Sequence, residues 1–391
     1  MKKILFISPT PPNHINRIRT LNLLKAWKGK AAIHFVCLAK EQKDYQYIER
    51  YAELFQDVKV FWQPKWRSLV LCLLGLIAGR SLQSSYCWNS KLARYLRDLN
   101  LSSFDVIYIK RLRMAQYATH LPADKVWIDL TDSMALHYSR MVETPVPLVD
   151  RAIAFYEKRF LGDCEREVTR TYRTIFCSKV DRSYACDGVT NESAAVTIPN
   201  AVDLSEFACV NHAPSSEPVY EICYWGNLNV QMNVTAVEIL LRDILPELVK
   251  KSPNIRLAII GPNPPKRFKR KYSGPFVFTG HVERLNTKLS NMDLFVCPLI
   301  FGTGVKNKVL QSLALGLPVL TTTIGVEGIE GIEEMVKQNI VFIEDDLSLY
   351  PDLIISLSKR KLCGERQARE FIRANYSIDC LRGSLVKNQL M

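Results

Sequence analysis

The sequence predicts an α/β protein built from two doubly wound, Rossmann-like domains, and three observations lead to this class. Short apolar runs rich in β-forming residues alternate with helical stretches in both halves of the chain. At 391 residues the chain is too long for one core and suits two domains of ordinary size. Apolar residues make up 48% and charged residues 23%, a balance typical of soluble globular proteins.

Buried parallel strands account for the apolar runs of the first half. They are KILFIS (3–8), AIHFVCLA (32–39), FDVIYIK (104–110), KVWIDL (125–130) and RTIFCS (173–178). Helices are expected at 15–28, 89–98 and 148–170. The basic start MKKILFISPT could suggest a signal peptide, but its apolar run from Ile4 to Ile7 is too short and stops at Ser8-Pro9. We therefore expect the chain to open with its first strand.

A second series of strands begins near residue 218. Its members are VYEICYWG (219–226), RLAIIG (256–261), FVFTG (276–280), LFVCPL (294–299), PVLTT (318–322) and IVFIE (340–344). Helices are expected at 231–250, 283–291, 305–315 and 347–361. The Pro/Asn turn in TIPNAVDLSEF, 197–207, marks the join, so the expected domains are 1–200 and 201–391.

Charge and cysteine content restrict the environment. The net charge is +13, and residues 1–200 hold 30 Lys and Arg against 19 Asp and Glu, so +11 lies in this half. A basic domain favours a polyanion or an anionic membrane surface, and no nucleic-acid-binding signature accompanies the charge. The eleven cysteines are scattered singly, without CxxC or Cys/His clusters. This pattern predicts reduced thiols in the cytoplasm and no metal site.

The stretch FGTGVKNKVLQSLALGLPVLTT, 301–322, places two glycines between the end of a strand and the start of a helix. Parallel sheets bind anions at this position, because unpaired backbone N–H groups point outward there. Lys306 and Lys308 lie in the first turn, where the helix dipole disfavours lysine and a bound diphosphate would favour it. The alternative is a glycine turn that leads into a surface helix with two solvated lysines.

Several segments carry a resemblance to a known family. GTGVKNKVLQSLALGLPVLTTTIGVEGI, preceded by TGHVERLNTKLSNMDLFVCPL and IPNAVDLSEF, resembles the donor half of a family 4 glycosyltransferase of GT-B architecture. SPTPPNHINRIRTLNLLKAW and WIDLTDSMALHYSRM resemble bacterial sugar transferases of the same family. The resemblance covers most of the chain. It implies an acceptor-binding domain at 1–200, a nucleotide-sugar-binding domain at 201–391 whose last helix can cross back, and a cleft between them.

The resemblance also implies the chemistry. A hexosyl group would leave the nucleotide-sugar, which is a substrate, with retention of configuration, no cofactor and no metal; the sequence indeed lacks a DxD motif. The implied donor-binding residues are Gly226, Asn227, Gly302, Thr303, Gly304, Lys306, Asn307, Lys308 and Gln311.

Two departures from the family pattern concern this donor set. Thr303 and Gln311 stand where many members have glutamates, and no Arg or Lys follows Gly226. The phosphate charge would therefore fall mainly on Lys306 and Lys308.

Candidate residues of the first half follow two strands. His14, Arg17 and Arg19 follow the first strand and could contact the donor diphosphate or an acceptor phosphate; the alternative is that both arginines are solvated helix residues. Asp129 and Asp132, in WIDLTDSMALHY, are the catalytic candidates, because a carboxylate there could take the acceptor proton or bind sugar hydroxyls. The alternative is that Asp132 or Ser133 caps the next helix.

The segment KWRSLVLCLLGLIAGRSLQSSYCW contains eleven apolar residues, 69–79, between basic flanks. This run is too short to span a bilayer and suits insertion into a membrane interface. The expected membrane-contacting residues are Arg67, Leu69, Leu73, Leu76 and Arg80. A buried core helix is the competing interpretation.

Together these features predict a retaining glycosyltransferase on the inner face of the cell membrane. It would move a sugar to a lipid-linked or glycan acceptor in cell-surface polysaccharide synthesis. Two alternatives stay open: a nucleotide-sugar 2-epimerase of the non-hydrolysing type, and a non-catalytic subunit that binds nucleotide-sugar or glycan.

Overall fold

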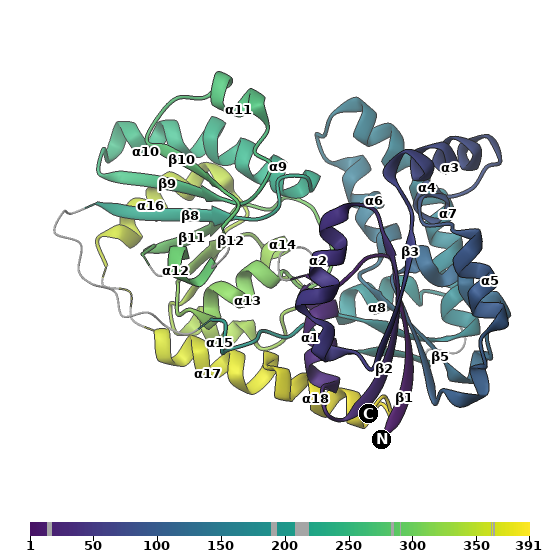
Figure 1. Cartoon of the computed structure of the whole chain (residues 1–391). Coiled ribbons are helices and arrows are strands. Elements are labelled where there is room, and N and C mark those ends of the chain that lie inside the picture. Colours follow the sequence, from purple (N-terminus) through teal and green to yellow (C-terminus); the bar gives the residue numbers. More distant parts are fainter. Residues whose placement is uncertain are drawn as a thin grey trace. The chain divides into compact units, whose positions relative to one another are not determined.

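The structure is a computed structural model of the chain. It describes residues 1–13, 18–188, 194–207, 219–282, 285–289, 291–360, 362 and 364–391, apart from the side chain of Lys269. The chain forms two compact units, one of residues 1–200 with 381–391 and one of residues 201–380. Each unit is built on one parallel sheet (Figure 1).

The sheet of the first unit has seven strands. They are β1 (Lys2–Ser8), β2 (Ala31–Ala39), β3 (Asp57–Trp62), β4 (Val106–Lys110), β5 (Val126–Thr131), β6 (Arg173–Phe176) and β7 (Ala195–Thr197). Their order is β3-β2-β1-β4-β5-β6-β7, and all neighbours are parallel. The chain therefore reverses its direction of travel across the sheet after β3, which is the doubly wound arrangement.

The α-helices of this unit are α1 (Ile18–Trp27), α2 (Gln42–Arg50), α3 (Lys65–Ile77), α4 (Leu82–Tyr86), α5 (Ser90–Asp98), α6 (Met134–Glu143), α7 (Leu148–Thr171) and α8 (Lys179–Ala185). Short 3-10 helices occupy η1 (Ala52–Leu54), η2 (Leu101–Ser103), η3 (Leu112–His120) and η4 (Ala123–Lys125).

Both faces of this sheet are buried, which explains why its strands are apolar runs rather than alternating patterns. Successive residues of β1 point to opposite faces. Leu5 and Ile7 join a core cluster with Leu92 of α5 on one face. On the other face Phe6 stacks on Tyr108, with ring centroids 5.0 Å apart, and meets the edge of Trp27 of α1.

The second unit repeats the arrangement with six parallel strands. They are β8 (Tyr220–Trp225), β9 (Ile255–Ile260), β10 (Phe276–Gly280), β11 (Leu294–Cys297), β12 (Val319–Thr321) and β13 (Val341–Ile343), in the order β10-β9-β8-β11-β12-β13.

The helices of the second unit are α9 (Gln231–Ile239), α10 (Leu245–Lys251), α11 (Lys266–Lys271), α12 (Leu285–Leu289), α13 (Asn307–Ala314), α14 (Thr323–Val326), α15 (Ile332–Lys337), α16 (Tyr350–Ser358) and α17 (Glu365–Tyr376). A π-helical turn, η6 (Leu240–Ile244), joins α9 to α10, and a 3-10 turn, η7 (Leu347–Leu349), precedes α16.

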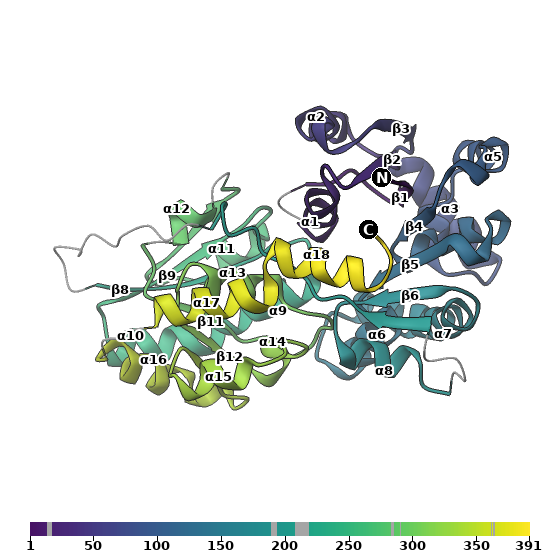
Figure 2. The same cartoon turned by 90° about the horizontal axis from the view of Figure 1, so that it is seen from below.

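The C-terminal segment belongs to the first unit. Helix α18 (Ile378–Lys387) crosses the unit boundary, and Figure 2 shows the end of the chain beside α1. Trp27 Nε1 donates a hydrogen bond to the carbonyl oxygen of Leu390 at 2.9 Å, and Arg382 Nε donates to that of Ala26. These bonds attach the last residues to α1.

The predicted α/β class with two doubly wound sheets is confirmed. Each predicted strand overlaps an observed one, from β1 to β13. Two strands were not predicted: β3, whose edge position leaves Asp57 and Trp62 exposed, and β7, which is only three residues long.

Candidate functional site

The glycine loop of the second unit connects β11 to α13 and takes backbone conformations that favour glycine. Gly302 has φ +139° and Gly304 has φ +71°, both in the region that L side chains rarely adopt. A Cβ on Gly302 would also lie 3.0 Å from the Met232 sulfur of α9. Gly302 is therefore favoured by its φ and by the close approach of Met232, and Gly304 by its φ alone.

Lys306 is buried at the start of α13 and stabilises the loop. Only 4% of its surface is exposed, and its Nζ donates to the carbonyl oxygen of Gly304 at 2.7 Å. The residue is the N-cap of α13 without a side-chain cap. The predicted phosphate ligand therefore sits inside the loop rather than in solvent, and the alternative of two solvated lysines is wrong.

Lys308 is buried behind the loop with uncharged partners. Its Nζ donates to the Tyr224 hydroxyl at 2.8 Å and to Asn233 Oδ1, and lies 4.6 Å from the centre of the Tyr224 ring. Among the described residues no carboxylate lies within ion-pair distance of it. Burial, with a smaller contribution from the nearby ammonium of Lys306, lowers the pKa of Lys308 to about 8. A buried ammonium without a counter-charge is poised to attract an anion.

The loop after β8 shares this network. Asn233 accepts from the Tyr224 hydroxyl at 2.8 Å, and its Nδ2 donates to the carbonyl oxygen of Asn227 at 2.8 Å. A Cβ on Gly226 would lie 2.9 Å from Asn233 Nδ2. No Arg or Lys follows Gly226, but Lys308 contacts this loop indirectly. Its ammonium donates to Asn233, and Asn233 donates to the backbone of Asn227.

Sequence reasoning missed Tyr224 and Asn233. A tyrosine inside an apolar strand and an asparagine in a helix give no local signal of function. Their role is visible only in the structure, where Tyr224 of β8 and Asn233 of α9 both hydrogen-bond to Lys308 of α13. Of the remaining predicted donor residues, Gln311 is 5% exposed within α13, and Thr303 is partly exposed. Asn307 Oδ1 is buried and has no hydrogen-bond partner among the described residues.

Asp129, in β5 of the first unit, is a fully buried carboxylate. Its Oδ2 accepts from the Tyr108 hydroxyl at 2.6 Å, Lys110 Nζ at 2.7 Å and Arg19 Nε at 3.0 Å. Its Oδ1 accepts from the Thr131 hydroxyl at 2.9 Å. Burial alone would raise the pKa of Asp129, but Arg19 and Lys110 outweigh it and hold the pKa well below its usual range. This is the geometry of a structural anion, with both oxygens in use.

Arg19 is the second member of this network. It is 6% exposed, so the alternative of a solvated helix residue is wrong for it. Nη1 donates to the carbonyl oxygens of Ile198 and Pro199 and to Asn200 Oδ1, which attaches α1 to the segment after β7. Nη2 is buried and has no hydrogen-bond partner among the described residues. The other two candidates of this loop, His14 and Arg17, lie outside the described residues.

Asp132 follows directly after β5 and keeps a partly exposed carboxylate. Its Oδ2 accepts from Arg111 Nη1 at 3.1 Å, and its Oδ1 accepts from the Cys177 thiol at 3.0 Å. Its side chain is 22% exposed. The preceding Thr131 has φ +70°, which is unusual for a β-branched residue and turns the chain sharply at the end of the strand.

Capping of α6 is performed by Ser133, not by Asp132. The Ser133 hydroxyl accepts from the backbone N–H of Leu136 and donates to Glu165 Oε2 at 2.7 Å. Glu165 also accepts the backbone N–H of Met134 at 2.6 Å, and burial raises its pKa to about 7. The cap is complete without Asp132, whose partly exposed carboxylate pairs with Arg111 and Cys177 instead.

Helix α3 does not form a core helix. Leu69, Leu73 and Leu76 are 60%, 62% and 48% exposed, and only Ser68 and Gly75 of this helix are buried. The competing interpretation of a buried helix is therefore wrong. Arg80 is exposed and Arg67 partly exposed. Within the described ranges no helix combines the length and apolarity that a membrane span requires.

Three comparisons relate the chain to known proteins. Residues 220–358 match the family model of "Glycosyl transferases group 1", which covers the glycine loop and the Tyr224, Asn233 and Lys308 network. HepE of Anabaena, solved with UDP and glucose, is 13% identical with a TM-score of 0.67, covering 100% of this chain and 99% of that chain. The apo lipopolysaccharide outer core galactosyltransferase WaaB is 10% identical with a TM-score of 0.59 over 100% of both chains.

A curated relative is similar over its whole length. It is an "Uncharacterized 44.6 kDa protein in cps region" of Klebsiella pneumoniae, 22% identical over 423 residues, which cover 99% of this chain and 100% of that protein.

These findings confirm the predicted GT-B fold. They also confirm the prediction that the chain is a glycosyltransferase, on the basis of the group 1 match over residues 220–358 of the second unit.

Proposed function

We propose that this glycosyltransferase moves a sugar from a UDP-sugar to a lipid-linked or glycan acceptor in cell-surface polysaccharide synthesis, with retention of configuration. One observation carries the proposal: the ammonium of Lys308 is buried beside the loops after β8 and β11, and its hydrogen-bond partners in the described part of the chain are uncharged. The UDP bound to HepE supports the donor class, and the relative from the cps region of Klebsiella pneumoniae supports the pathway type.

In this proposal the second unit neutralises the leaving diphosphate. Lys308 and Lys306 supply positive charge, and the first turn of α13 adds backbone N–H groups and the positive end of its dipole. Positive groups fixed in a buried site stabilise charge that develops in the transition state without further reorganisation. Gln311 would bind a ribose hydroxyl as a neutral group.

The first unit contributes the acceptor side of the reaction. Asp132 is the carboxylate that can take the acceptor proton, because it is partly exposed and unused by the helix cap. Asp129, the other predicted catalytic residue, would act indirectly by fixing Lys110 and Arg19 beneath the end of β5. The unpartnered Nη2 of Arg19 would be the atom that meets a phosphate.

Substitution of Lys308 tests the donor site. Lys308→Met keeps most of the apolar volume and removes the ammonium, so the affinity for UDP should fall by about 10- to 100-fold, the equivalent of a charge-assisted hydrogen bond. Calorimetric titration with UDP measures the effect. Lys337→Met removes one exposed lysine from α15 and serves as the control. Equal affinities in all three proteins would contradict the site.

We also propose that the first unit attaches to an anionic membrane through α3. Its exposed leucines form an apolar face, and Lys65, Arg67 and Arg80 surround it with positive charge. Apolar side chains with basic flanks suit the interface between headgroups and acyl chains. This attachment would hold the unit beside a lipid-linked acceptor on the cytoplasmic face.

One alternative function has an observation in its favour. Thr303 and Gln311 lack the carboxylates of many relatives, which is compatible with a nucleotide-sugar-binding subunit that performs no transfer. Turnover of UDP-sugar at any measurable rate would exclude it. An epimerase would instead release UDP without an acceptor and yield an epimerised sugar.

A further inference from the structure

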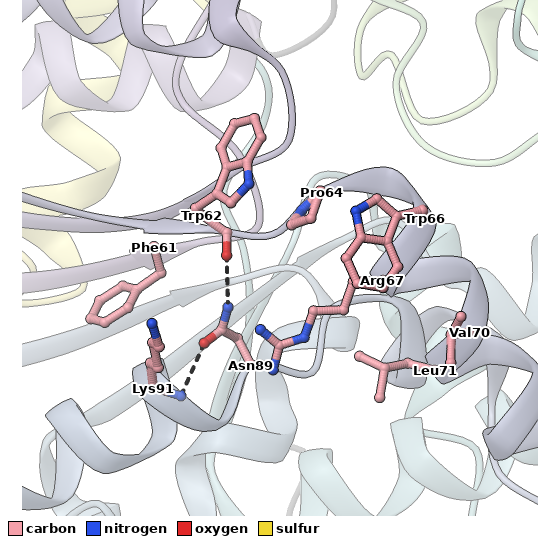
Figure 3. A pocket seen from close by; sticks show the side chains of 9 residues that line it. All are labelled: Phe61, Trp62, Pro64, Trp66, Arg67, Val70, Leu71, Asn89 and Lys91. Atoms are coloured by element: carbon pink, nitrogen blue, oxygen red, sulfur yellow. Dashed lines mark hydrogen bonds between the residues drawn. The ribbon is translucent and has the colours of Figure 1, made fainter.

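A cavity of about 590 Å³ lies in the first unit where β3 ends and where α3 and α5 begin. Figure 3 shows its lining: Phe61 and Trp62 come from β3, Trp66 and Arg67 from the first turn of α3, and Lys91 from the first turn of α5. None of these residues belongs to the donor network or to the surroundings of Asp132. The cavity is therefore separate from the donor network and from Asp132.

The lining is positively charged. Arg67 and Lys91 are its two charged residues, and no acidic side chain lines it. Neither cation forms an ion pair with an acid within the described part of the chain. Lys65, which lies in sequence between the lining residues Pro64 and Trp66, shows the contrast, because its ammonium is paired with Glu41. Two unneutralised cations in one cavity favour an anionic ligand.

The base of the cavity is rigid. Asn89 is 1% exposed, and its Oδ1 accepts the backbone N–H groups of Lys91 and Leu92 at the start of α5. Its Nδ2 donates to the carbonyl oxygen of Trp62 (Figure 3). The same Nδ2 donates to Gln63 Oε1 at 2.9 Å. These bonds fix the end of β3 against α5 and hold Lys91 at the cavity. The positive ends of the α3 and α5 dipoles add to the same field.

The rest of the lining is apolar and leads to the exposed face of α3. Trp62, Trp66 and Val70 are 47%, 68% and 47% exposed, and Leu69 and Leu73 of the same helix continue this surface beyond the cavity. An inorganic phosphate would use the cations but not the indole rings. A ligand that joins a phosphate to a hydrocarbon chain would use both.

We propose that this cavity binds the phosphate and the first chain units of a lipid phosphate, the carrier of the acceptor glycan. The proposal rests on the proposed function, because it gives the lipid-linked acceptor a binding site. Arg67 and Lys91 contact the phosphate, Trp62 and Trp66 flank the chain, and the chain leaves along the leucines of α3 into the bilayer.

The position of the cavity limits the acceptor. All strands of this sheet are parallel, so the ends of β3 and β5 lie at the same edge. The strand order puts four interstrand steps between them, and at ~4.8 Å per step the cavity and Asp132 lie on the order of 20 Å apart. The lipid phosphate therefore cannot be the attacking group. The acceptor hydroxyl belongs to a glycan that extends from the phosphate to Asp132.

Calorimetric titration of the full chain tests the proposal with three probes: farnesyl phosphate below its micelle concentration, farnesol and inorganic phosphate. We expect farnesyl phosphate to bind at least about tenfold more tightly than either other probe. Arg67→Ala/Lys91→Ala should lower its affinity about tenfold or more. Arg94→Ala/Arg97→Ala removes the same charge from exposed positions of α5 outside the cavity and should bind like the parent.

Other outcomes overturn the site. If farnesol binds as tightly as farnesyl phosphate, the cavity does not contact the phosphate. If inorganic phosphate binds as tightly, the cavity does not bind the chain. If both double variants lose the same affinity for farnesyl phosphate, the effect comes from overall charge and not from the cavity. Titration of the cavity variant with UDP separates this proposal from the donor site. If the cavity variant binds both UDP and farnesyl phosphate as tightly as the parent does, the lipid site is wrong and the donor site is unaffected.

Discussion

At the scale of single residues, the pKa of Lys308 makes donor binding depend on pH. Its pKa is lowered to about 8 in the free protein because burial disfavours the ammonium. A bound diphosphate favours the ammonium and raises this pKa again. Above pH 8 the free protein has a mostly neutral Lys308 and must take up a proton on binding, so the affinity for UDP should fall as pH rises from 8 toward 10.

Calorimetry of UDP binding at pH 8.5 measures this linkage. In two buffers of different ionisation enthalpy the parent should show net proton uptake, and Lys308→Met should show none. Equal proton uptake by both proteins would mean that another group titrates and that Lys308 does not meet the phosphate.

Substitution of Asp129, in β5, and of Asp132, just after this strand, should have different effects. Asp129→Asn leaves Arg19 and Lys110 buried without their carboxylate and should destabilise the protein by ~3–5 kcal/mol. Asp132→Asn should change stability little and reduce kcat by roughly 10²- to 10⁴-fold while the affinity for UDP stays the same. Thermal unfolding and steady-state kinetics measure both. A stable Asp132→Asn with parental kcat would remove Asp132 from the chemistry.

Residue types identified the candidates, but their surroundings could not be predicted. The sequence places both lysines beside the glycine loop, and the structure buries them there. The sequence could not show that Lys308 turns inward to Tyr224, 84 positions away, or that Asp129 meets Arg19 across 110 positions. Burial and long-range pairing decide whether a carboxylate is catalytic or structural, and neither follows from local spacing.

At the scale of elements, α3 carries the membrane prediction. Leu73→Glu/Leu76→Glu places two carboxylates on the exposed apolar face, where each leucine inserted into the bilayer contributes roughly 1.5–3 kcal/mol. Binding to phosphatidylglycerol vesicles should therefore fall by more than about tenfold, and binding of the parent should weaken with salt.

A matched control keeps this test specific. Val277→Glu/Val386→Glu adds the same charge at two exposed apolar positions on β10 and α18, 52% and 57% exposed, and should bind vesicles nearly as well as the parent. If the α3 variant co-sediments as the parent does, α3 is not the contact.

Elements with a strong apolar signal were predicted well, and weak ones were not. The central strands are buried on both faces, so their composition identifies them. The edge strand β3, DVKVFW, mostly alternates exposed and partly buried residues, so it lacks the continuous apolar run that identifies the central strands. The length of the α3 apolar run was read correctly, but only the structure shows that its leucines face outward.

At the scale of the whole molecule, each unit has a sheet of 3-2-1-4-5-6 strand order, which a seventh strand extends in the first unit. The two units carry different candidate groups, and this difference predicts that transfer does not depend on a metal ion. The second unit carries the buried lysines at the end of its sheet, and the first carries Asp132 at the end of its own. If the lysines and the α13 dipole neutralise the leaving diphosphate, transfer needs no divalent cation. Turnover of a UDP-sugar, followed as UDP release with acceptor, should persist in EDTA. Complete loss in EDTA that Mn²⁺ or Mg²⁺ restores would assign this charge to a metal and leave Lys308 a structural role.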